Sequence, residues 1–316
     1  MTTSNWSVDQ ELHFILTGFP GLHSIHSWIS IPFLFIFLVM LFGNLTVLLV
    51  IATEQSLHEP MYYLISFLSV VDLLIGVTLL PQLLIILWLG SQTIRFDSCI
   101  LQMFFLSFVV SMESSVLVLM AYDRFVAVCK PLRYSAVITN KFILKGGFAI
   151  SVRSLCIVLP LPVLATALKY NSKSIIDNVY CEYFAVVSAA QIHSALNDIY
   201  LYLICFLVIL PDTVMIGLSY YMIVRAALKL RSKEAQLKLF STCSSHVLGI
   251  LSFYISGAVS LLVFLVENEV PIFMHSLFSV LYISVPPTVN PLIYGIKTKA
   301  ILTVILKHAQ NIKNMF

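Results

Sequence analysis

The sequence predicts an all-α membrane protein, a seven-transmembrane helix bundle followed by a short amphipathic helix. Three observations predict this fold. Of the 316 residues, 59% are hydrophobic and only 10% are charged, whereas about 25% of the residues of a soluble domain are charged. Seven apolar runs reach the roughly 20 residues that a helix needs to cross the hydrocarbon of a bilayer. The basic residues are concentrated in alternate connectors between those runs.

The seven predicted spans follow one another along a single domain, residues 1–316, and short polar connectors separate them. They cover residues 28–52, 60–89, 99–127, 143–167, 197–226, 239–265 and 271–295. Residues 1–27 precede the bundle, residues 28–295 form it, and residues 296–316 follow it as a tail. From Lys297 onward the tail is basic and partly amphipathic, so we expect a short helix on the membrane surface and no eighth span.

The distribution of basic residues predicts the orientation in the membrane. Fourteen of the 18 Lys and Arg residues lie in the second and third connectors of one side or in the tail, and the other side holds only Arg95, Lys169 and Lys173. Because loops rich in Lys and Arg stay in the cytoplasm, the N-terminus is expected outside and the tail inside. Residues 1–27 contain no Lys or Arg and so lack the positive region of a cleavable signal peptide. The first span is therefore expected to serve as the insertion signal.

Two features of the predicted outer segments agree with this orientation. Asn5-Trp6-Ser7 is a glycosylation sequon before the first span. A three-residue match is weak, since Asn44-Leu45-Thr46 is also a sequon and lies inside a span. Of the six cysteines, only Cys99 and Cys181 fall at outer positions. A disulfide between them is permitted in the oxidising compartment, and closing a loop of about 80 residues could contribute roughly 4 kcal/mol to stability.

Two carboxylates are expected near the middle of the membrane. By the helix rise of about 1.5 Å per residue, Asp72 of the second span and Glu113 of the third span reach a similar depth. Both cannot stay charged there at low cost, so they either hold a proton as a hydrogen-bonded structural pair or bind a cation such as Na⁺. Neutral ligands for a cation are available in Ser114, Asn44 and Asn290. Apart from this possible Na⁺ we expect no cofactor.

Small and polar residues in the outer halves of three spans predict a ligand cavity. On the third and sixth spans they recur at helical spacing and so share one face of each helix. The candidate ligand residues are Ser107, Val110, Ser111, Cys205, Val208, Tyr254, Gly257 and Leu261. A mostly apolar cavity with a few hydroxyls suits a small, partly hydrophobic molecule. The alternative is that serine and glycine only let the helices approach closely.

Charged and proline-containing motifs mark the inner ends of the third and seventh spans. Asp123 and Arg124 lie where a long apolar run ends, and charges at such a boundary need a partner, water or a function to offset their desolvation. In the seventh span, Pro291 removes a backbone donor, and we expect the side chain of Asn290 to satisfy the carbonyl that the proline frees. Such a joint could swivel, with Tyr294 pointing toward the inner surface.

Taken together, these motifs resemble those of the rhodopsin-like G-protein-coupled receptors. The resemblance rests on Gly43-Asn44, Leu68-Ser-Val-Val-Asp72, Asp123-Arg124 and Asn290-Pro-Leu-Ile-Tyr294. Within that group the chain resembles an olfactory receptor, on the stretches Leu57–Tyr62, Met120–Tyr134, Ser219-Tyr220, Phe240–His246 and Pro287–Tyr294. Phe125, Gly18–Leu22 and the region of Arg153 are similar to the class I, or fish-like, branch.

The resemblance implies an odorant receptor and not an enzyme. It implies that small volatile or weakly polar molecules bind in the outer half of the bundle, that helix 6 moves outward, and that a stimulatory G protein of the olfactory type raises cyclic AMP. The implied location is the plasma membrane, multi-pass, with a cytoplasmic amphipathic helix 8; the implied partners are the odorant, the heterotrimeric G protein and membrane lipid, and no nucleic acid. Arg124 would be released toward the G protein and braced by two tyrosines. The implied switch residues are Asp123, Arg124, Tyr220, His246, Asn290 and Tyr294.

Two departures from the family pattern affect the expected ligand. Olfactory receptors usually carry two further cysteines in the second outer loop, where this chain has Asn171 and Gln191. We therefore expect no second loop disulfide and a looser lid. Class I receptors often have a His-Arg pair near the outer end of helix 6, suited to a carboxylate, where this chain reads Phe264-Leu-Val-Glu267. We expect a neutral or weakly polar odorant in preference to a carboxylic acid.

Other classes of membrane protein fit the sequence less well. An opsin needs a Schiff-base lysine within the seventh span, but the first lysine there is Lys297, at its inner end. An amine receptor needs an aspartate high in helix 3, where this chain has Leu106 and Ser107, so a cation anchor is not visible. A transporter or channel could use the charges inside the membrane as a polar path, but internal repeats are not apparent.

Overall fold

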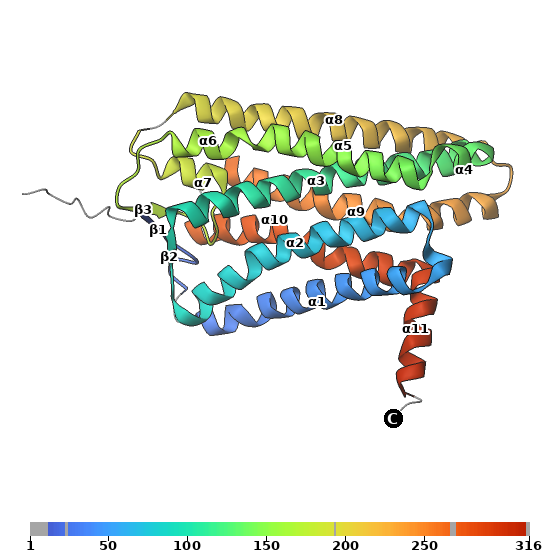
Figure 1. Cartoon of the computed structure of the whole chain (residues 1–316), viewed down its shortest axis with the longest axis horizontal. Coiled ribbons are helices and arrows are strands. Elements are labelled where there is room, and N and C mark those ends of the chain that lie inside the picture. Colours follow the sequence, from blue (N-terminus) through green and yellow to red (C-terminus); the bar gives the residue numbers. More distant parts are fainter. Residues whose placement is uncertain (1–11, 23–24, 193, 266–269, 314–316) are drawn as a thin grey trace, which may run out of the picture.

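Seven helices lie side by side in one bundle (Figure 1). The computed structural model describes residues 12–22, 25–192, 194–265 and 270–313. Within these ranges, the helices long and apolar enough to cross a membrane are α1 (His26–Thr53), α2 (Pro60–Leu89), α3 (Phe96–Cys129), the pair α5 (Asn140–Val158) and α6 (Pro160–Thr166), α8 (Ala195–Leu228), α9 (Lys233–Leu265) and α10 (Ile272–Lys297). The predicted all-α seven-helix fold class is confirmed.

The fourth span is made of two helices because of its prolines. α5 ends at Val158 and α6 begins at Pro160. Proline has no N–H to donate to the preceding turn, whereas its fixed φ suits the first turn of a new helix. Only Leu159 separates the two helices, so α5 and α6 together form one membrane span.

One helix begins well before the predicted span, and the reason is local. α9 begins at Lys233, whereas the apolar run begins at residue 239. The hydroxyl of Ser232 accepts a hydrogen bond from the backbone N–H of Ala235 (3.4 Å), and Glu234 lies in the first turn, where the helix dipole favours a negative charge. These polar residues extend α9 beyond the apolar run.

A three-stranded sheet that the sequence analysis did not predict closes one end of the bundle, called the sheet end below. The central strand β1 (His13–Leu16) is antiparallel to β2 (Thr93–Arg95) and parallel to β3 (Lys173–Ile176). Phe14 and Leu16 of β1 are fully buried, because alternate residues of a strand point to opposite faces. The sheet therefore ties the segment before α1 to two connectors between the spans.

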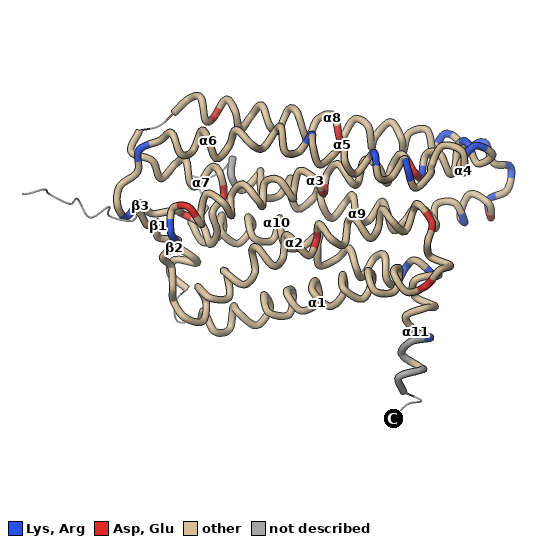
Figure 2. Tube along the Cα trace, viewed as in Figure 1, with Lys and Arg blue, Asp and Glu red and all other residues tan. Residues whose placement is uncertain are grey.

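The other end of the bundle, the basic end, gathers Lys and Arg residues (Figure 2). Its connectors include the short helices η2 (Gln55–Leu57), η3 (Pro131–Arg133) and α4 (Tyr134–Val137). From this end α11 (Lys299–Lys313) projects away from the bundle (Figure 1), and Nζ of Lys307 lies 3.3 Å from Oε1 of Glu54. α11 agrees with the predicted amphipathic helix after the seventh span.

Burial is uneven among the helices. In the most apolar stretches of α2 and α3, 56% and 61% of the residues are buried, compared with 17% in α8 and in α9. α2 and α3 therefore form the centre of the bundle, while α8 and α9 turn most of their side chains outward, toward the surface that lipid covers.

The close approach of α1 and α10 depends on a glycine. A Cβ added at Gly43 would lie 2.9 Å from two ring carbons of Pro291. Real Cβ atoms do not approach so closely, and the ring carbons of a buried proline cannot rotate aside. Gly43 therefore allows the backbones of α1 and α10 to meet at Pro291.

We expect Gly43→Ala to destabilise the protein, because overpacking a filled core costs about 1–3 kcal/mol. The measurement is the thermal unfolding midpoint of the purified protein in detergent. The matched control is Gly217→Ala in α8, where an added Cβ meets nothing within 4 Å and where alanine should preserve or raise stability by about 0.5–1 kcal/mol. Equal midpoints for the two variants would contradict the role given to Gly43.

Candidate functional site

The two charged residues near the basic end of α3 do not form an ion pair with each other. Asp123 is buried, and its Oδ1 accepts a hydrogen bond from the hydroxyl of Tyr134 in α4 (2.8 Å). Burial and the Asp123 carboxylate raise the pKa of Tyr134, which keeps this hydroxyl a donor. Arg124 is half-buried and donates to the sulfur of Met61 in α2. A thioether is a weak acceptor, and no carboxylate of the described residues lies within ion-pair distance of Arg124.

The two tyrosines expected to brace Arg124 contact α9 in this structure. The hydroxyl of Tyr220 in α8 forms a 2.8 Å hydrogen bond with Nδ1 of His246. Tyr294 in α10 is 3% exposed and its hydroxyl makes no hydrogen bond. It lies against Gly249, where an added Cβ would be 2.7 Å from that hydroxyl. Both contacts join α9 to a neighbour near the basic end, so both must change if α9 moves outward.

The carbonyl that Pro291 frees is satisfied by a different residue from the one expected. Pro291 cannot donate to the carbonyl of Pro287, four residues earlier, and Nδ2 of Asn44 in α1 donates to it instead (3.0 Å). The expectation that Asn290 would satisfy it is wrong. Nδ2 of Asn290 donates to both carboxylate oxygens of Asp72, at 3.2 and 3.1 Å. The side chain of Asn290 crosses to α2, while Asn44 comes within reach because its neighbour is glycine.

The two carboxylates inside the membrane belong to an oxygen-rich cluster at the centre of the bundle. Asp72 and Glu113 are 0% and 2% exposed and interact electrostatically. Asn44 Oδ1, Glu113 Oε1 and Asn290 Oδ1 are buried and accept no hydrogen bond. Carboxylate and amide oxygens suit a hard cation, so the residues fit Na⁺. Among the described residues no group of three or more His, Cys, Asp and Glu could hold a metal ion.

An ion pair that the sequence analysis did not assign joins α5 to α8. Nη1 of Arg153 lies 2.8 Å from Oδ1 of Asp212 and donates to the hydroxyl of Ser115 (2.7 Å). Nη2 of Arg153 donates to the carbonyl of Leu207 (2.9 Å). That carbonyl lies four residues before Pro211, which cannot supply the helical donor. Arg153 therefore neutralises Asp212 and also satisfies the carbonyl that Pro211 frees.

The serines of α3 are largely engaged by these neighbours. Ser111 donates to the hydroxyl of Ser154 in α5 (3.0 Å). Ser114 donates to Oδ2 of Asp212 (2.8 Å), not to the carboxylate cluster for which it was a candidate ligand. Ser107 donates to the carbonyl of Met103 in its own helix (2.8 Å). Ser111 and Ser114 thus serve as links between helices.

The candidate ligand residues differ in exposure. Ser111 and Val208 are buried, Ser107, Val110, Tyr254 and Gly257 are half-buried, and Cys205 and Leu261 are exposed. Val110 and Tyr254 pack against one buried cluster that contains Ile216 and Phe253, so the structure brings candidates from α3 and α9 together. The hydroxyl of Tyr254 is buried, and it has no hydrogen-bond partner of good geometry among the described residues.

The connector between α6 and α8, called the lid below, covers the sheet end and is held by one disulfide and by hydrogen bonds. The predicted disulfide between Cys99 and Cys181 is present. At the positions where the family usually has a second loop disulfide, Nε2 of Gln191 donates to Oδ1 of Asn171 (2.8 Å). The backbone N–H of Gln191 donates to the carbonyl of Lys169 (2.9 Å). An amide pair therefore closes this part of the loop without a covalent bond. The predicted glycosylation site Asn5 lies outside the described residues, as does Glu267.

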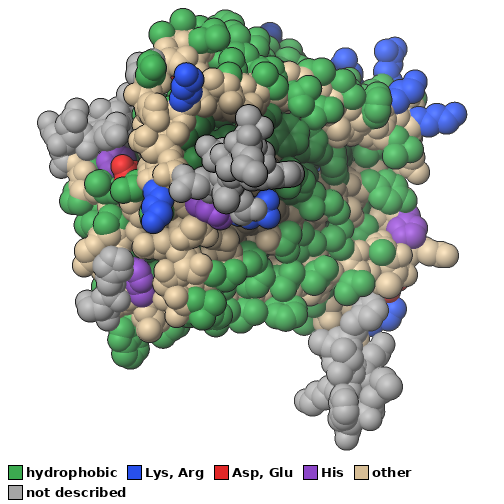
Figure 3. Space-filling model, turned by 60° about the vertical axis from the view of Figure 1, so that its left-hand side comes forward, with side chains coloured by type: hydrophobic (Ala, Val, Ile, Leu, Met, Phe, Trp, Pro, Cys, Tyr) green, Lys and Arg blue, Asp and Glu red, His purple; other side chains and the backbone are tan. Residues whose placement is uncertain are grey.

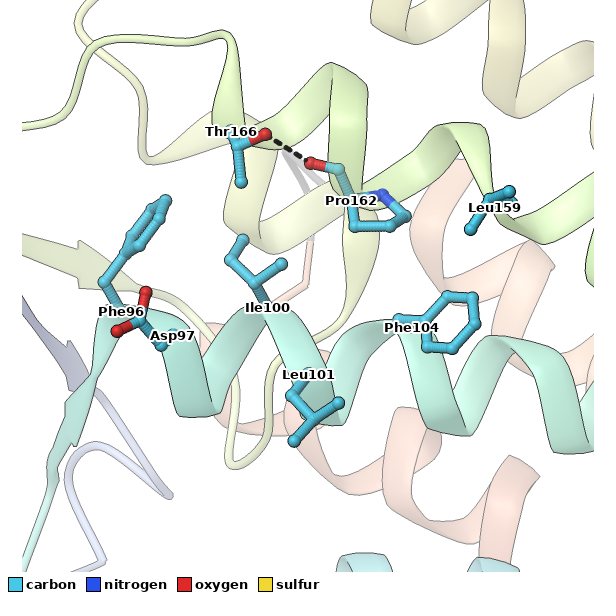
Figure 4. A pocket seen from close by; sticks show the side chains of 8 residues that line it. All are labelled: Phe96, Asp97, Ile100, Leu101, Phe104, Leu159, Pro162 and Thr166. Carbon is cyan, nitrogen blue, oxygen red and sulfur yellow. Dashed lines mark hydrogen bonds between the residues drawn. The ribbon is translucent and has the colours of Figure 1, made fainter.

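The surface of the bundle has hollows of two kinds. The space-filling view of the sheet end shows a recess lined with hydrophobic side chains (Figure 3). A separate apolar pocket of about 260 Å³ lies between α3 and α6 (Figure 4), and it is lined by Phe96, Asp97, Ile100, Leu101, Phe104, Leu159, Pro162 and Thr166. Leu101 and Leu159 are 65% and 52% exposed, and no candidate ligand residue lines this pocket. It opens toward the surface that lipid covers and is not the predicted cavity.

The chain is similar to known proteins along almost its whole length. The family model described as "Olfactory receptor" matches residues 33–311. Human Olfactory receptor 52K1 is 41% identical over 315 residues, which cover 100% of each chain. Human Olfactory receptor 52K2 is 40% identical over 306 residues, 97% of this chain and 98% of the relative. The crystal structure of squid rhodopsin has a TM-score of 0.74 at 15% identity, over 92% of this chain and 87% of that chain, which shows the same fold.

The ion pair between α5 and α8 leads to a stability prediction. We expect Arg153→Met or Asp212→Leu alone to lower the thermal unfolding midpoint strongly, because removing one partner leaves a buried charge and costs about 3–5 kcal/mol. The double variant should be more stable than the sum of the two single losses predicts, because no buried charge is left unpaired. It should remain less stable than the parent, because the Leu207 carbonyl loses the donor that Arg153 supplies. Unfolding of the purified protein in detergent measures all three variants. A double variant as unstable as the two single losses added together would contradict the pairing.

Proposed function

This chain belongs to the class I branch of the olfactory receptor family, and we propose that it binds small volatile or weakly polar odorants in the half of the bundle nearest the sheet. Olfactory receptors are G-protein-coupled receptors of the plasma membrane that take small-molecule ligands and are not enzymes. The finer proposal is that this receptor activates a stimulatory G protein of the olfactory type and so raises cyclic AMP.

The observation that supports this proposal most directly is that α3 carries residues of both proposed sites. Ser107 and Ser111 are candidate ligand residues, and Arg124 is the proposed switch residue. At the level of Ser111 the helix is linked to α5, and at its other end Arg124 has no carboxylate partner among the described residues. Arg124 lies thirteen positions after Ser111, which corresponds to about 20 Å of helix. A displacement of α3 or of the helices it contacts at one end would therefore alter the packing around Arg124 at the other.

The orientation we propose places the sheet end outside the cell and the basic end in the cytoplasm. Lys and Arg gather at the basic end, as the positive-inside rule expects of cytoplasmic loops. The Cys99–Cys181 disulfide lies at the sheet end, as expected of an oxidising compartment. The N-terminus is then extracellular, and α11 lies at the inner surface of the membrane, where its basic residues can contact anionic lipid.

The ligand class we propose is neutral or weakly polar in preference to carboxylate. The region near the outer end of α9 reads Phe264-Leu-Val-Glu267 and offers no basic residue to an anion. The described cations of the sheet end are exposed: Arg95, Lys169 and Lys173 either pair with Asp97 or lie in the lid. A carboxylate ligand would therefore lose its hydration without gaining a buried counterion.

We propose that the carboxylate cluster binds Na⁺. Asp72 and Glu113 would supply the charge, and the unpartnered amide oxygens of Asn44 and Asn290 would complete the ligand set. A bound cation there would offset the repulsion between the two carboxylates. Asn290 would hold Asp72 in position, and because Asn290 precedes Pro291 in α10, occupancy of the site would affect the position of α10.

We expect Arg124→Ala to abolish ligand-dependent signalling, because the guanidinium is the proposed contact to the G protein. The measurement is a panel of odorants of matched chain length, with hexanol, hexyl acetate and hexanoic acid among them, tested for cyclic AMP in cells that express the receptor.

The same panel tests the proposed ligand class, since neutral compounds should activate the parent receptor at lower concentration than the acid.

Surface labelling of an N-terminal tag is the control, since it separates lost coupling from lost expression. A robust response to short carboxylates without a response to matched alcohols or esters would overturn the proposed ligand class. A full response in Arg124→Ala would overturn the proposed switch.

We expect the concentration of odorant that gives half-maximal activation to depend on Na⁺ in the parent receptor and to lose that dependence in the double variant Asp72→Asn with Glu113→Gln. The amides preserve the shape of the cluster but remove the charge that attracts the cation. Nucleotide exchange on the G protein, measured in membranes with Na⁺ replaced by N-methylglucamine, gives the comparison. A double variant that responds to Na⁺ as the parent does would leave the cluster as a protonated structural pair.

A further inference from the structure

The loop that follows β3 enters the bundle and reaches α10. Val179 and Tyr180 are 0% and 2% exposed and belong to the same buried cluster as Leu83 of α2 and Val280 of α10. The disulfide at Cys181 holds the loop to α3. The short helix α7 (Tyr183–Ser188) begins directly after Glu182. This geometry places Glu182 between the lid and the seventh span.

The carboxylate of Glu182 is held by donors from two directions. Its Oε2 accepts hydrogen bonds from Nδ2 of Asn178 in the same loop (2.7 Å) and from the hydroxyl of Ser279 in α10 (3.0 Å). Ser279 is also hydrogen-bonded to the hydroxyl of Tyr180 at 2.6 Å. The side chain is thus oriented toward α10, away from the solvent above the lid.

No cation of the described residues forms an ion pair with the Glu182 carboxylate. None of the ion pairs formed by the described residues involves Glu182, and its second oxygen, Oε1, accepts no hydrogen bond from them. Burial raises the pKa of Glu182, and the hydrogen bonds from Ser279 and Asn178 offset only part of that rise. A carboxylate in this situation gains most from a cation that arrives with its own hydrogen-bond donors. Glu182 remains partly exposed, so the group is not sealed from a ligand.

A second buried polar group at the same level has no partner. Ser276 lies one helical turn before Ser279 on the buried face of α10; it is 0% exposed, and its hydroxyl makes no hydrogen bond. Nε2 of the neighbouring His275 is also buried without a hydrogen bond. Hydroxyl and neutral imidazole groups can accept hydrogen bonds. An ammonium group has three N–H donors, and here it meets a charged acceptor with further neutral acceptors nearby on α10.

We propose that Glu182 anchors the ammonium group of a small aliphatic amine, which makes protonated amines a further ligand class of this receptor beside the neutral odorants. The inference rests on the proposed function, because it places the ligand in the sheet-end half of the bundle. It also accounts for the cation anchor missing from α3, because the carboxylate comes from the loop after Cys181. A carboxylic acid is repelled by the same group, and an alcohol can donate only one hydrogen bond to it.

Cyclic AMP dose responses to hexylamine, hexanol and hexanoic acid test the proposal in the full-length receptor at the cell surface. The variant is Glu182→Gln, whose side-chain oxygen can still accept from Asn178 and Ser279 but carries no charge. We expect the half-maximal concentration of hexylamine to rise by about tenfold or more, as for loss of a hydrogen bond to a charged group, while that of hexanol stays within about twofold. The matched control is Asp177→Asn, an exposed carboxylate of the same loop, which should leave all three responses unchanged.

The outcomes separate this inference from the proposed function. A parent receptor that responds to hexanol but not to hexylamine overturns the amine anchor and leaves the receptor function in place. An equal shift for amine and alcohol in Glu182→Gln also overturns it, since that result would show a structural role only. Activation by hexanoic acid that depends on His275 would replace the proposed anchor with a carboxylate site. A receptor at the surface that raises no cyclic AMP with any compound of the odorant panel would count against the proposed function itself.

Discussion

The need to satisfy backbone carbonyls inside the membrane decides how the helices of this receptor are tied together. Two prolines inside spans, Pro211 of α8 and Pro291 of α10, each leave a carbonyl without its helical donor. In hydrocarbon no water can replace that donor, and each unsatisfied group costs several kcal/mol. Both carbonyls are satisfied by a side chain from another helix, by Arg153 for Leu207 and by Asn44 for Pro287. The prolines that loosen single helices thereby strengthen the contacts between helices.

The two side chains that satisfy these carbonyls also organise the charges of the bundle. Arg153 neutralises Asp212, and through Ser115 it joins α3 to the same network. Once Asn44 occupies the proline carbonyl, the amide of Asn290 is free to bond Asp72. The first arrangement is neutral overall, because a guanidinium meets a carboxylate. The second is not, because two carboxylates meet only amides, and this contrast is why a cation is expected at one site and not at the other.

At the sheet end, the lid is held by one disulfide, by strand pairing and by side-chain hydrogen bonds. The disulfide fixes the loop to α3, while the central strand β1 fixes the segment before α1 to two connectors. Farther along the loop, the Asn171–Gln191 amide pair is a single hydrogen bond, whose net contribution is only about 0.5–1.5 kcal/mol. The lid is therefore held covalently next to Glu182 and by a weaker contact farther along.

The sequence alone determined the architecture of this receptor, because the signals for it are local. A span is recognised as a run of apolar residues, and the Cys99–Cys181 bridge joins two cysteines that the sequence places on the same side of the predicted spans. The family resemblance likewise rests on short stretches such as Met120–Tyr134. Strand β1 escaped prediction because a four-residue strand has too short an alternating pattern to stand out.

Only the tertiary structure decided which polar groups meet. The partner of a proline carbonyl can come from any helix, so the assignment to Asn290 failed where Asn44 succeeded. Arg153 and Asp212 lie in different spans, and Glu182 and Ser279 come from a loop and a helix nearly a hundred residues apart in the chain. Hydrogen bonds and ion pairs act over about 3 Å, and no pattern in the sequence records which side chains the packing of the helices brings within that distance.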